Sequence, residues 1–363
     1  MSGRSPGRNF RGAAIGVAAA LAVTGAPPAM AGTPAGPSWR IVKRVPSGPL
    51  GDFTAVVAVG RSGGWAFNGI SKPTAWRRSG SSWTEVSFPS QNGEVVVAAG
   101  ASSSATNVWA FTASGGRSRA LRWNGSHWSV QRSFPAQIGG AVVLSASDVW
   151  VFGQPFIPGS GLGAWHYNGH VWARVASGAG LEGGSGLSAS DIWAFDGTRV
   201  AHWNGHGWAR TSVAGLLPAK RPLNSPAVVG VDEQAPNSVF AIGSGNTQDE
   251  GGPTVILHFN GHIWRKVAQG SFGVGTSPLQ QVSSDGHGGL WIPMPGTGGR
   301  PSFLVHYSGG RLTEASLPGG AARINVESVA LIPGTTSELG GGFTHAPLNP
   351  GTSVVAVILQ LGR

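Results

Sequence analysis

One short pattern recurs along most of the chain and limits what it can fold into. It is Asp or Asn, then an aliphatic residue, then Trp at the start of an apolar run, and its three clearest copies span residues 107–111, 148–152 and 191–195. Looser copies centre on Trp65, Phe240, Trp291 and Leu339. From Trp65 to Leu339 the copies are 44, 41, 43, 47, 51 and 48 residues apart. A period in the forties with several short strands in each unit predicts the blades of a β-propeller.

A second pattern alternates with the first and predicts hairpins. It places an aromatic residue on each side of an Asn-Gly pair, as at residues 123–128, 167–172, 203–208 and 259–264, with weaker copies at 78–83 and 307–312. Asn-Gly between apolar runs is a strong signal for a tight turn between antiparallel strands. Helical repeats of this length would need apolar residues at i, i+3 and i+4, whereas these runs alternate with a period of two.

Each unit divides into four strands. In the unit that follows Trp83, the expected strands are residues 95–99, 108–112, 120–123 and 128–131. The Asp or Asn before the second strand suits a tight turn in which its side chain bonds nearby backbone groups.

The two ends of the repeat region complement each other. Residues 357–361 match the third strand at 255–259 and stop where a fourth strand is due, and residues 38–42 resemble the fourth strand at 263–267. The N-terminal strand therefore completes the last blade and removes exposed sheet edges. We predict an all-β fold, a single domain over residues 38–363 that is a propeller of four-stranded blades. Seven blades fit best, with six or eight as alternatives where the divergent units mislead.

The first 31 residues have the features of an export signal. Arg4, Arg8 and Arg11 precede an apolar stretch at residues 13–26, and Ala29-Met30-Ala31 forms a small-residue cleavage site. We expect cleavage after Ala31, a short linker at 32–37, and a secreted protein that either enters the medium or stays at the cell wall. We expect no membrane span after cleavage. The chain has 0 Cys, so its folding uses no disulfide and no Cys-ligated metal.

The charge balance favours an anionic partner without naming one. The chain carries 25 basic and 15 acidic residues, and removing the three signal arginines lowers the formal net charge from +10 to +7. A cell-wall polymer is one candidate partner, and a merely solvated basic surface is the alternative. Lys43-Arg44 and Lys220-Arg221 are isolated pairs, so we expect no nucleic-acid binding.

The repeat units resemble a known group. Ser-Ala-Ser-Asp-Val-Trp at 145–150 and His-Trp-Asn-Gly-x-x-Trp at 202–208 are similar to the repeats of secreted actinobacterial propellers, which are grouped near kelch proteins and the central domain of galactose oxidase. The resemblance covers about residues 38–363 and implies the architecture but no activity. The copper site of galactose oxidase needs a tyrosine cross-linked to cysteine, which this chain lacks.

Repeated histidines and tryptophans fit structural roles. His166, His202, His258 and His306 share one repeat column, which predicts polar contacts between blades or at their rim, not one metal site. All 15 tryptophans fall in the second-strand and fourth-strand columns, or in third strands, which predicts packing between blades. We predict no catalytic, cofactor-binding or metal-binding constellation.

Acidic pairs are the remaining candidates for chemistry. Asp249-Glu250 is expected in a long loop and Asp232-Glu233 in a short inner turn. Neighbours in sequence seldom face each other across a scissile bond, so we interpret both pairs as solvated.

A function should occupy the end of the ring where the connections between strands two and three and between blades vary. Our candidate residues for a binding face are the distinctive members of these connections: Phe156, Lys220, Arg221, Asp249, Glu250, Arg300 and His345. The primary hypothesis is a secreted, monomeric, non-catalytic binding module without a cofactor, whose ligand is a wall polymer, a glycan or a protein. The alternative is a secreted carbohydrate-active enzyme, a glycoside hydrolase or lyase, with loop carboxylates above the central channel.

Overall fold

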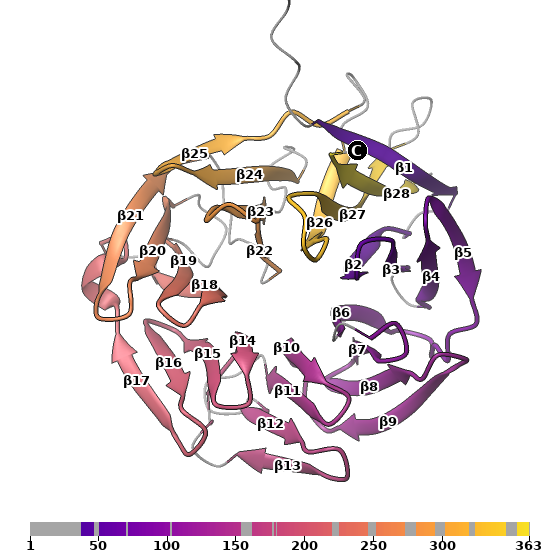
Figure 1. Ribbon diagram of the computed structural model, residues 1–363, viewed down its shortest axis with the longest axis horizontal. Helices are drawn as coiled ribbons and strands as arrows, with labels where there is room; N and C mark the ends of the chain where they lie inside the picture. The colour runs from indigo at the N-terminus through magenta and orange to yellow at the C-terminus, as the bar shows by residue number, and fades with distance from the viewer. Residues whose placement is uncertain are drawn as a thin grey trace, which may run out of the picture. The chain divides into compact units, whose positions relative to one another are not determined.

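A computed structural model describes most of the repeat region. The described residues are 38–46, 51–69, 72–101, 104–153, 162–175, 178, 180–219, 225–245, 252–272, 281–294, 302–318, 324–345 and 354–362. They all belong to one compact unit, residues 37–363. This unit is a ring of seven antiparallel sheets of four strands each (Figure 1), so the fold and the blade number predicted from the sequence are confirmed.

The first four blades follow one another along the chain. Their strands are, in blade 1, β2 (Phe53–Val59), β3 (Gly63–Asn68), β4 (Thr74–Ser79) and β5 (Ser82–Val86); in blade 2, β6 (Val95–Ala101), β7 (Val108–Ser114), β8 (Arg117–Trp123) and β9 (Trp128–Phe134); in blade 3, β10 (Ile138–Ser145), β11 (Asp148–Gly153), β12 (Ala164–Tyr167) and β13 (Trp172–Val175); and in blade 4, β14 (Gly183–Ser188), β15 (Asp191–Asp196), β16 (Arg199–Trp203) and β17 (Trp208–Ser212). A 3₁₀ turn, η3 (Ala214–Leu216), follows β17.

The other three blades complete the ring. Their strands are, in blade 5, β18 (Ala227–Ala235), β19 (Ser238–Ser244), β20 (Thr254–Phe259) and β21 (Trp264–Gly270); in blade 6, β22 (Ser283–Ser284), β23 (Leu290–Met294), β24 (Phe303–Ser308) and β25 (Arg311–Glu314); and in blade 7, β26 (Ile324–Leu331), β27 (Glu338–His345), β28 (Val354–Leu361) and β1 (Trp39–Pro46).

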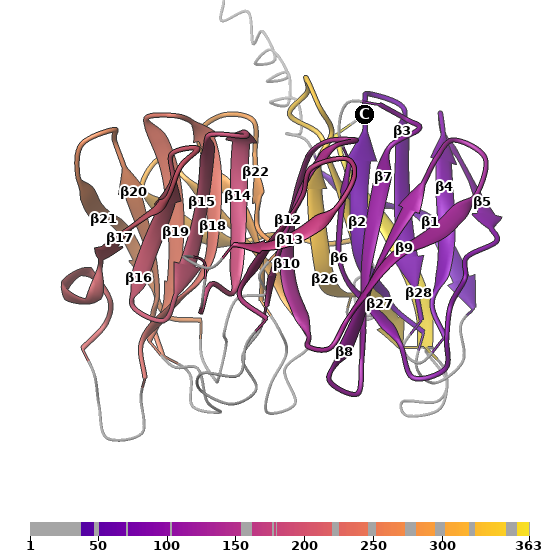
Figure 2. The ribbon, with the colours of Figure 1, turned by 90° about the horizontal axis from the view of Figure 1, so that it is seen from below.

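Every blade has its first strand nearest the axis and its fourth at the outer wall (Figure 1). The strands run from one end of the ring to the other, as the side view in Figure 2 shows. We call the end with the connections from second to third strands and from one blade to the next the loop face. The other end carries the connections from first to second and from third to fourth strands, and we call it the turn face.

The N-terminal strand closes the ring as predicted. β1 pairs antiparallel with β28 from Trp39↔Leu361 to Pro46↔Val355, with one bulge between Ile41 and Lys43. This pairing covers the outer edge of the last blade, which would otherwise expose unpaired backbone groups.

Asparagine side chains fix the hairpins between the third and fourth strands of blades 2 to 5. In the 3–4 hairpin of blade 2, Asn124 Oδ1 accepts hydrogen bonds from the backbone N–H groups of Ser126 and His127, both at 3.0 Å. Gly125 follows with a φ of +104°, a conformation that disfavours any residue with a Cβ. Blades 3, 4 and 5 repeat this arrangement through Asn168, Asn204 and Asn260.

Asp and His side chains meet inside blades 3, 4 and 6, so of the two alternatives that we predicted, contacts between blades or at their rim, the contacts between blades were wrong. In blade 3, Asp148 Oδ1 accepts from Trp150 Nε1 at 3.0 Å and lies 2.9 Å from His166 Nε2. The His166 ring stacks on Trp150 with centroids 4.4 Å apart. Second and third strands are hydrogen-bonded neighbours in one sheet, which is why the two columns meet there. In blade 3 the Asp side chain therefore bonds other side chains, where we expected backbone, whereas Asp285 of blade 6 also accepts from the backbone N–H groups of His287 and Gly289.

The contacts between blades are made by tryptophans, as predicted. In five of the seven interfaces a Trp of a second strand meets a Trp of the fourth strand of the next blade edge to face, with ring centroids 5.1–6.0 Å apart and planes 76–88° apart. The pairs are Trp65–Trp128, Trp109–Trp172, Trp150–Trp208, Trp193–Trp264 and Trp291–Trp39.

Two interfaces lack this tryptophan pair. Between blades 5 and 6, Phe240 of the second strand meets Tyr307 of the third strand at 5.7 Å, and Leu312 of the fourth strand packs against the same cluster. Between blades 7 and 1, Leu339 packs in one cluster with Trp83. These are the blades whose repeats diverge most in sequence, so divergence changed the side chains but kept the packing columns.

We predict that Trp172→Ala lowers the free energy of unfolding by about 3–5 kcal/mol, because it empties the contact with Trp109 and Phe134. Its neighbour Val171 is 58% exposed, so Val171→Ala is the matched control and should change stability by less than about 0.5 kcal/mol. Chemical denaturation measures both. Equal losses in the two variants would contradict the packing role of the fourth-strand column.

Candidate functional site

The inner strands enclose a cavity on the axis of the ring. Its volume is about 350 Å³, and every blade contributes to its lining. The lining residues are Val56, Val57, Ala98, Ala99, Gly139, Gly140, Ala141, Gly183, Gly184, Asp232, Gln281, Val282, Ser283, Ser284, Val329, Ala330 and Leu331. The volume is at the lower end of the range for small-molecule or side-chain pockets.

Small residues leave this space open. Blades 1 to 4 line the cavity with Gly, Ala and Val alone. At the junction of blades 3 and 4 the backbones are so close that a Cβ on Gly140 would lie 3.0 Å from Gly183 Cα. A larger residue in either place would push the two inner strands apart.

The polar groups of the cavity lie on one side. Asp232 comes from β18 of blade 5, and Gln281, Ser283 and Ser284 come from blade 6. Gln281 reaches across the axis, since its Nε2 donates to the backbone oxygen of Val97 in blade 2 at 2.9 Å. Val97 lies at a bulge of β6, which leaves its carbonyl free of the regular ladder.

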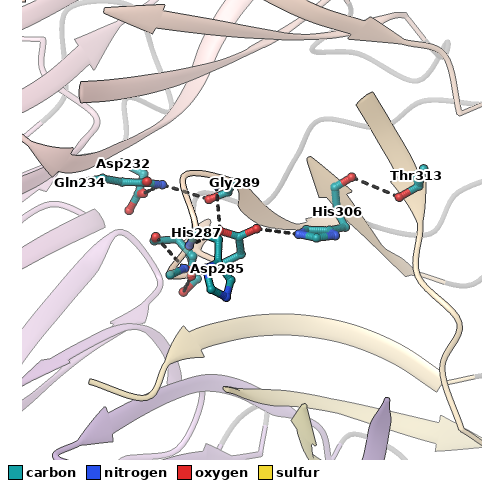
Figure 3. A network of polar contacts seen from close by, with 10 residues as sticks. Asp232, Gln234, Asp285, His287, Gly289, His306 and Thr313 are labelled. Carbon is teal, nitrogen blue, oxygen red and sulfur yellow. Dashed lines mark hydrogen bonds and ion pairs between the residues drawn. The ribbon is translucent and has the colours of Figure 1, made fainter. Parts of the chain in front are cut away.

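A hydrogen-bond network leads from the cavity to the turn face (Figure 3). Gln234 Nε2 donates to Asp232 Oδ2 and to the carbonyl oxygen of Gly289, both at 3.0 Å. Gly289 N in turn donates to Asp285 Oδ1 at 2.8 Å, and Asp285 Oδ2 lies 2.8 Å from His306 Nε2. Blades 5 and 6 are thus joined by polar contacts in addition to the contact of Phe240 with Tyr307.

Two carboxyls of this network differ in acidity. Burial raises the pKa of Asp232 to about 6, and the nearby Asp285 charge adds to the rise against the hydrogen bond from Gln234. Burial also opposes ionisation of Asp285, but hydrogen bonds from His306 and the backbone N–H groups of His287 and Gly289 outweigh it and lower its pKa. Asp285 is therefore the anionic member, and Asp232 changes charge near neutral pH.

A third carboxyl lies behind the cavity wall. Glu338 of blade 7 is 0% exposed, and its Oε2 accepts from Ser283 Oγ at 3.1 Å. Burial raises its pKa well above the ordinary value, and the charges of Asp232 and Asp285 add to the rise. The protonated carboxyl is the stable form here, since the opposing hydrogen bond from Ser283 is too weak to favour the charge.

A fourth carboxyl corrects an expectation from the sequence. Asp232 and Glu233 lie on β18, paired with Phe240 and Val239 of β19, and not in the turn, which begins after Ala235. Because the ladder extends through this pair, Glu233 is only 6% exposed. Burial raises its pKa to about 9, and the adjacent Asp191 carboxylate, which itself lies 2.7 Å from His202 Nε2, raises it further. The interpretation of the pair as solvated was wrong.

Two more carboxyls meet towards the loop face. Asp52 precedes β2 in blade 1, and Glu327 lies at a bulge of β26 in blade 7. Burial and then the Glu327 charge raise the pKa of Asp52 to about 6. Burial raises the pKa of Glu327 as well, against a hydrogen bond from Ser302 Oγ.

A second cavity, of about 300 Å³, opens at the loop-face edge of blade 2, and we call it the blade-2 pocket. Its lining is entirely polar: Gln91, Glu94, Ser114, Arg117, Ser118, Arg119 and Ser133. Arg119 and Glu94 form an ion pair in its wall, and they are 8% and 3% exposed.

Most residues that we nominated from the sequence lie outside the described part. These are Phe156, Lys220, Arg221, Asp249, Glu250 and Arg300. For His345 the structure describes the backbone, which pairs with Val354 at the loop-face end of β27.

Sequence reasoning missed the cavity residues Asp232 and Gln281 and the pair Glu94–Arg119. One signal was available, because Asp232 interrupts the apolar run that forms the first strand of blade 5. The ion pair joins residues 25 positions apart, and no local pattern announces it.

Within the described residues, no group of three or more His, Cys, Asp or Glu side chains is arranged to hold a metal ion. In the same part of the chain, no helix has the length and hydropathy that crossing a membrane requires.

Comparison with known proteins supports the fold and adds no family. No family model matches the chain, and no curated protein matches it. Solved structures of similar fold include YCF48 bound to D1 peptide, with a TM-score of 0.56, 11% identity, and coverage of 90% of this chain and 97% of that one.

Two WD40 structures are also similar in fold. The RRP9 WD40 repeats have a TM-score of 0.59 at 10% identity and cover 89% of this chain and 99% of their own. The WD40 β-propeller domain of Doa1 has a TM-score of 0.59 at 10% identity, covering 88% and 96%. Identities this low establish a shared propeller architecture and nothing of function.

We predict that Glu233→Gln stabilises the protein at pH 8 by about 1–3 kcal/mol. At this pH the wild-type chain must take up a proton at Glu233 when it folds, whereas an amide is neutral in both states. The native state retains the Glu233 proton from the ordinary pKa of 4.5 up to about 9, so the wild-type chain loses stability as pH rises through that window. Denaturation at several pH values should show the advantage of the variant shrinking towards pH 5. Glu85→Gln, at an exposed position, should show no such trend.

Proposed function

We propose that the chain is a secreted, non-catalytic binding module for a protein partner. The partner approaches the loop face and places an extended segment at the axial cavity. The export signal predicted at residues 1–31 supports secretion. The kelch-like and actinobacterial resemblance of the repeats stays a prediction and adds no ligand.

The observation that carries this proposal is the axial cavity, which has a polar side built from Asp232, Gln281 and Ser283 on a rigid ring. The walls from blades 1 to 4 are Gly, Ala and Val, so the cavity can accept a side chain or a short segment and orient it through few hydrogen bonds. A rigid scaffold whose cavity has polar groups on one side is suited to recognise a peptide segment, because the scaffold loses little conformational freedom on binding.

The similar structures agree with a protein partner. One of them is a propeller described as bound to a peptide. At 11% identity this similarity supports a peptide or protein as the class of ligand and says nothing of its sequence.

The experiment places a photoreactive amino acid, p-benzoylphenylalanine, at Ala99 in the cavity and, as control, at the exposed Ala173 on the outer strand β13. Both full-length variants are irradiated in cells that express the protein. We expect a discrete cross-linked protein adduct from position 99 and none from position 173. No adduct at position 99, or the same adducts at both positions, would refute a partner at the axis.

A second candidate function, a secreted glycoside hydrolase or lyase, is favoured by the pair Asp52 and Glu327. A carboxyl with a pKa of about 6 beside a second carboxyl has the character of a general acid. If this candidate holds, the full chain releases reducing or unsaturated sugar ends from wall polysaccharide, and Asp52→Asn lowers the rate at least about 100-fold. Absence of release by the wild-type chain removes the candidate.

A further inference from the structure

The blade-2 pocket differs from the other polar clusters because its one acid is already saturated. Glu94 Oε1 accepts from Thr112 Oγ1 at 3.0 Å and from Arg119 Nε at 2.6 Å. Its Oε2 accepts from the backbone N–H of Gln91 at 2.8 Å and from Arg119 Nη2. Each carboxylate oxygen of Glu94 already accepts two hydrogen bonds, so Glu94 offers an incoming ligand no further acceptor. Its charge is balanced by Arg119.

The polar groups of the pocket that remain available to a ligand are hydrogen-bond donors. Arg119 Nη2 also donates to the carbonyl oxygen of Pro89 at 2.7 Å, and Arg119 Nη1 makes no hydrogen bond within the described residues. Arg117 is exposed and has no ion pair or hydrogen bond in that same part of the chain. Ser118 Oγ accepts from Ile138 N at 2.9 Å and keeps its own proton free to donate.

The pocket therefore carries one net positive charge. Arg117 and Arg119 contribute two, and Glu94 removes one. A carboxylate, with one negative charge and a planar pair of oxygens, balances this charge and matches the geometry of a guanidinium. A phosphate dianion would leave an excess negative charge a short distance from Glu94.

The pocket is pre-organised. Its wall is held by the Arg119–Glu94 pair, and these two residues are 8% and 3% exposed. It is bounded by the connection between blades 1 and 2 and by the β7–β8 turn, both on the loop face. This is the face on which we expect the partner.

We propose that the blade-2 pocket binds a carboxylate of an acidic segment of the protein partner, with Arg117 as its ion partner and with Arg119 Nη1 and the serine hydroxyls as further donors. The proposal rests on the proposed function and names the chemistry of part of the ligand. It also gives the basic character of the chain a specific role.

The test uses fluorescein-labelled peptides of alternating Ser and Glu, and of alternating Ser and Gln, with the full chain at low ionic strength. Fluorescence anisotropy should give saturable binding of the Glu peptide and about tenfold weaker binding of the Gln peptide. The Arg117→Gln variant should bind the Glu peptide about tenfold more weakly than the wild-type chain does, and should bind the Gln peptide with unchanged affinity. Since Arg117 is exposed and has no partner in the described residues, the circular dichroism and melting temperature of the Arg117→Gln variant should match those of the wild-type chain.

The control is Arg174→Gln, which removes the same charge from an exposed position on the outer strand β13. It should bind the Glu peptide like the wild-type chain. Equal losses in Arg117→Gln and Arg174→Gln would reduce the effect to general surface charge and overturn the proposal. So would failure of the Glu peptide to bind, or displacement by inorganic phosphate far more readily than by acetate.

The two proposals fail separately. A cross-link at position 99 that persists in Arg117→Gln, with unchanged peptide affinity, would leave the binding module intact and remove the carboxylate pocket. Peptide binding that depends on Arg117, without any adduct at position 99, would retain the pocket and remove the partner from the axis.

Discussion

The ring depends on apolar packing between blades, which in five of the seven interfaces is the edge-to-face contact of a second-strand tryptophan with a fourth-strand tryptophan of the next blade. Single sheets of four strands cannot bury both faces, and each gains a core only by packing on its neighbours. Indole pairs supply a large buried area together with a preferred perpendicular geometry worth about 0.5–1.5 kcal/mol beyond that area. Repetition of this contact fixes the angle between successive blades.

Closure follows from the same contact. Trp39 belongs to β1, the strand that completes blade 7, and its ring meets Trp291 of blade 6 with centroids 5.4 Å apart. The N-terminal strand is therefore held twice, by the backbone ladder with β28 and by the interface with the preceding blade. β1 therefore cannot leave blade 7 without breaking both the ladder and this interface.

The sequence predicted the structure where the repeat is regular. It did not predict contacts between side chains that occur in a single blade or at a single interface. The columns of Trp65, Trp109 and Trp150 predicted the blade interfaces, because a side chain repeated at a fixed period has the same surroundings in every unit. The partner of His166 was misjudged, since a column alone does not say whether its neighbour lies in the same sheet or the next.

The candidate site was harder to predict because it depends on contacts between distant segments. Asp232 and Glu233 look like a turn pair in the sequence, and only the register with β19 makes them part of a strand. Gln281 reaches Val97 across 184 positions of chain, and Glu94 meets Arg119 only after a hairpin brings them together. Such pairs carry no periodic signal.

Acidic residues lie on the first strands near the axis, and basic residues lie on the fourth strands at the outer wall. The net charge of the chain therefore does not describe the charge at its pockets. The described first strands carry three acidic residues and no basic one: Asp232, Glu233 and Glu327. The fourth strands carry mostly basic residues: Arg40, Lys43, Arg44, Arg132, Arg174, Arg210, Arg265, Lys266 and Arg311, against Glu85 and Glu314. The positive charge is thus spread round the outer wall, where solvent screens it. A pocket such as that of Arg117, walled by a neutralised ion pair, can recognise an anion specifically, whereas the dispersed wall can only attract one weakly.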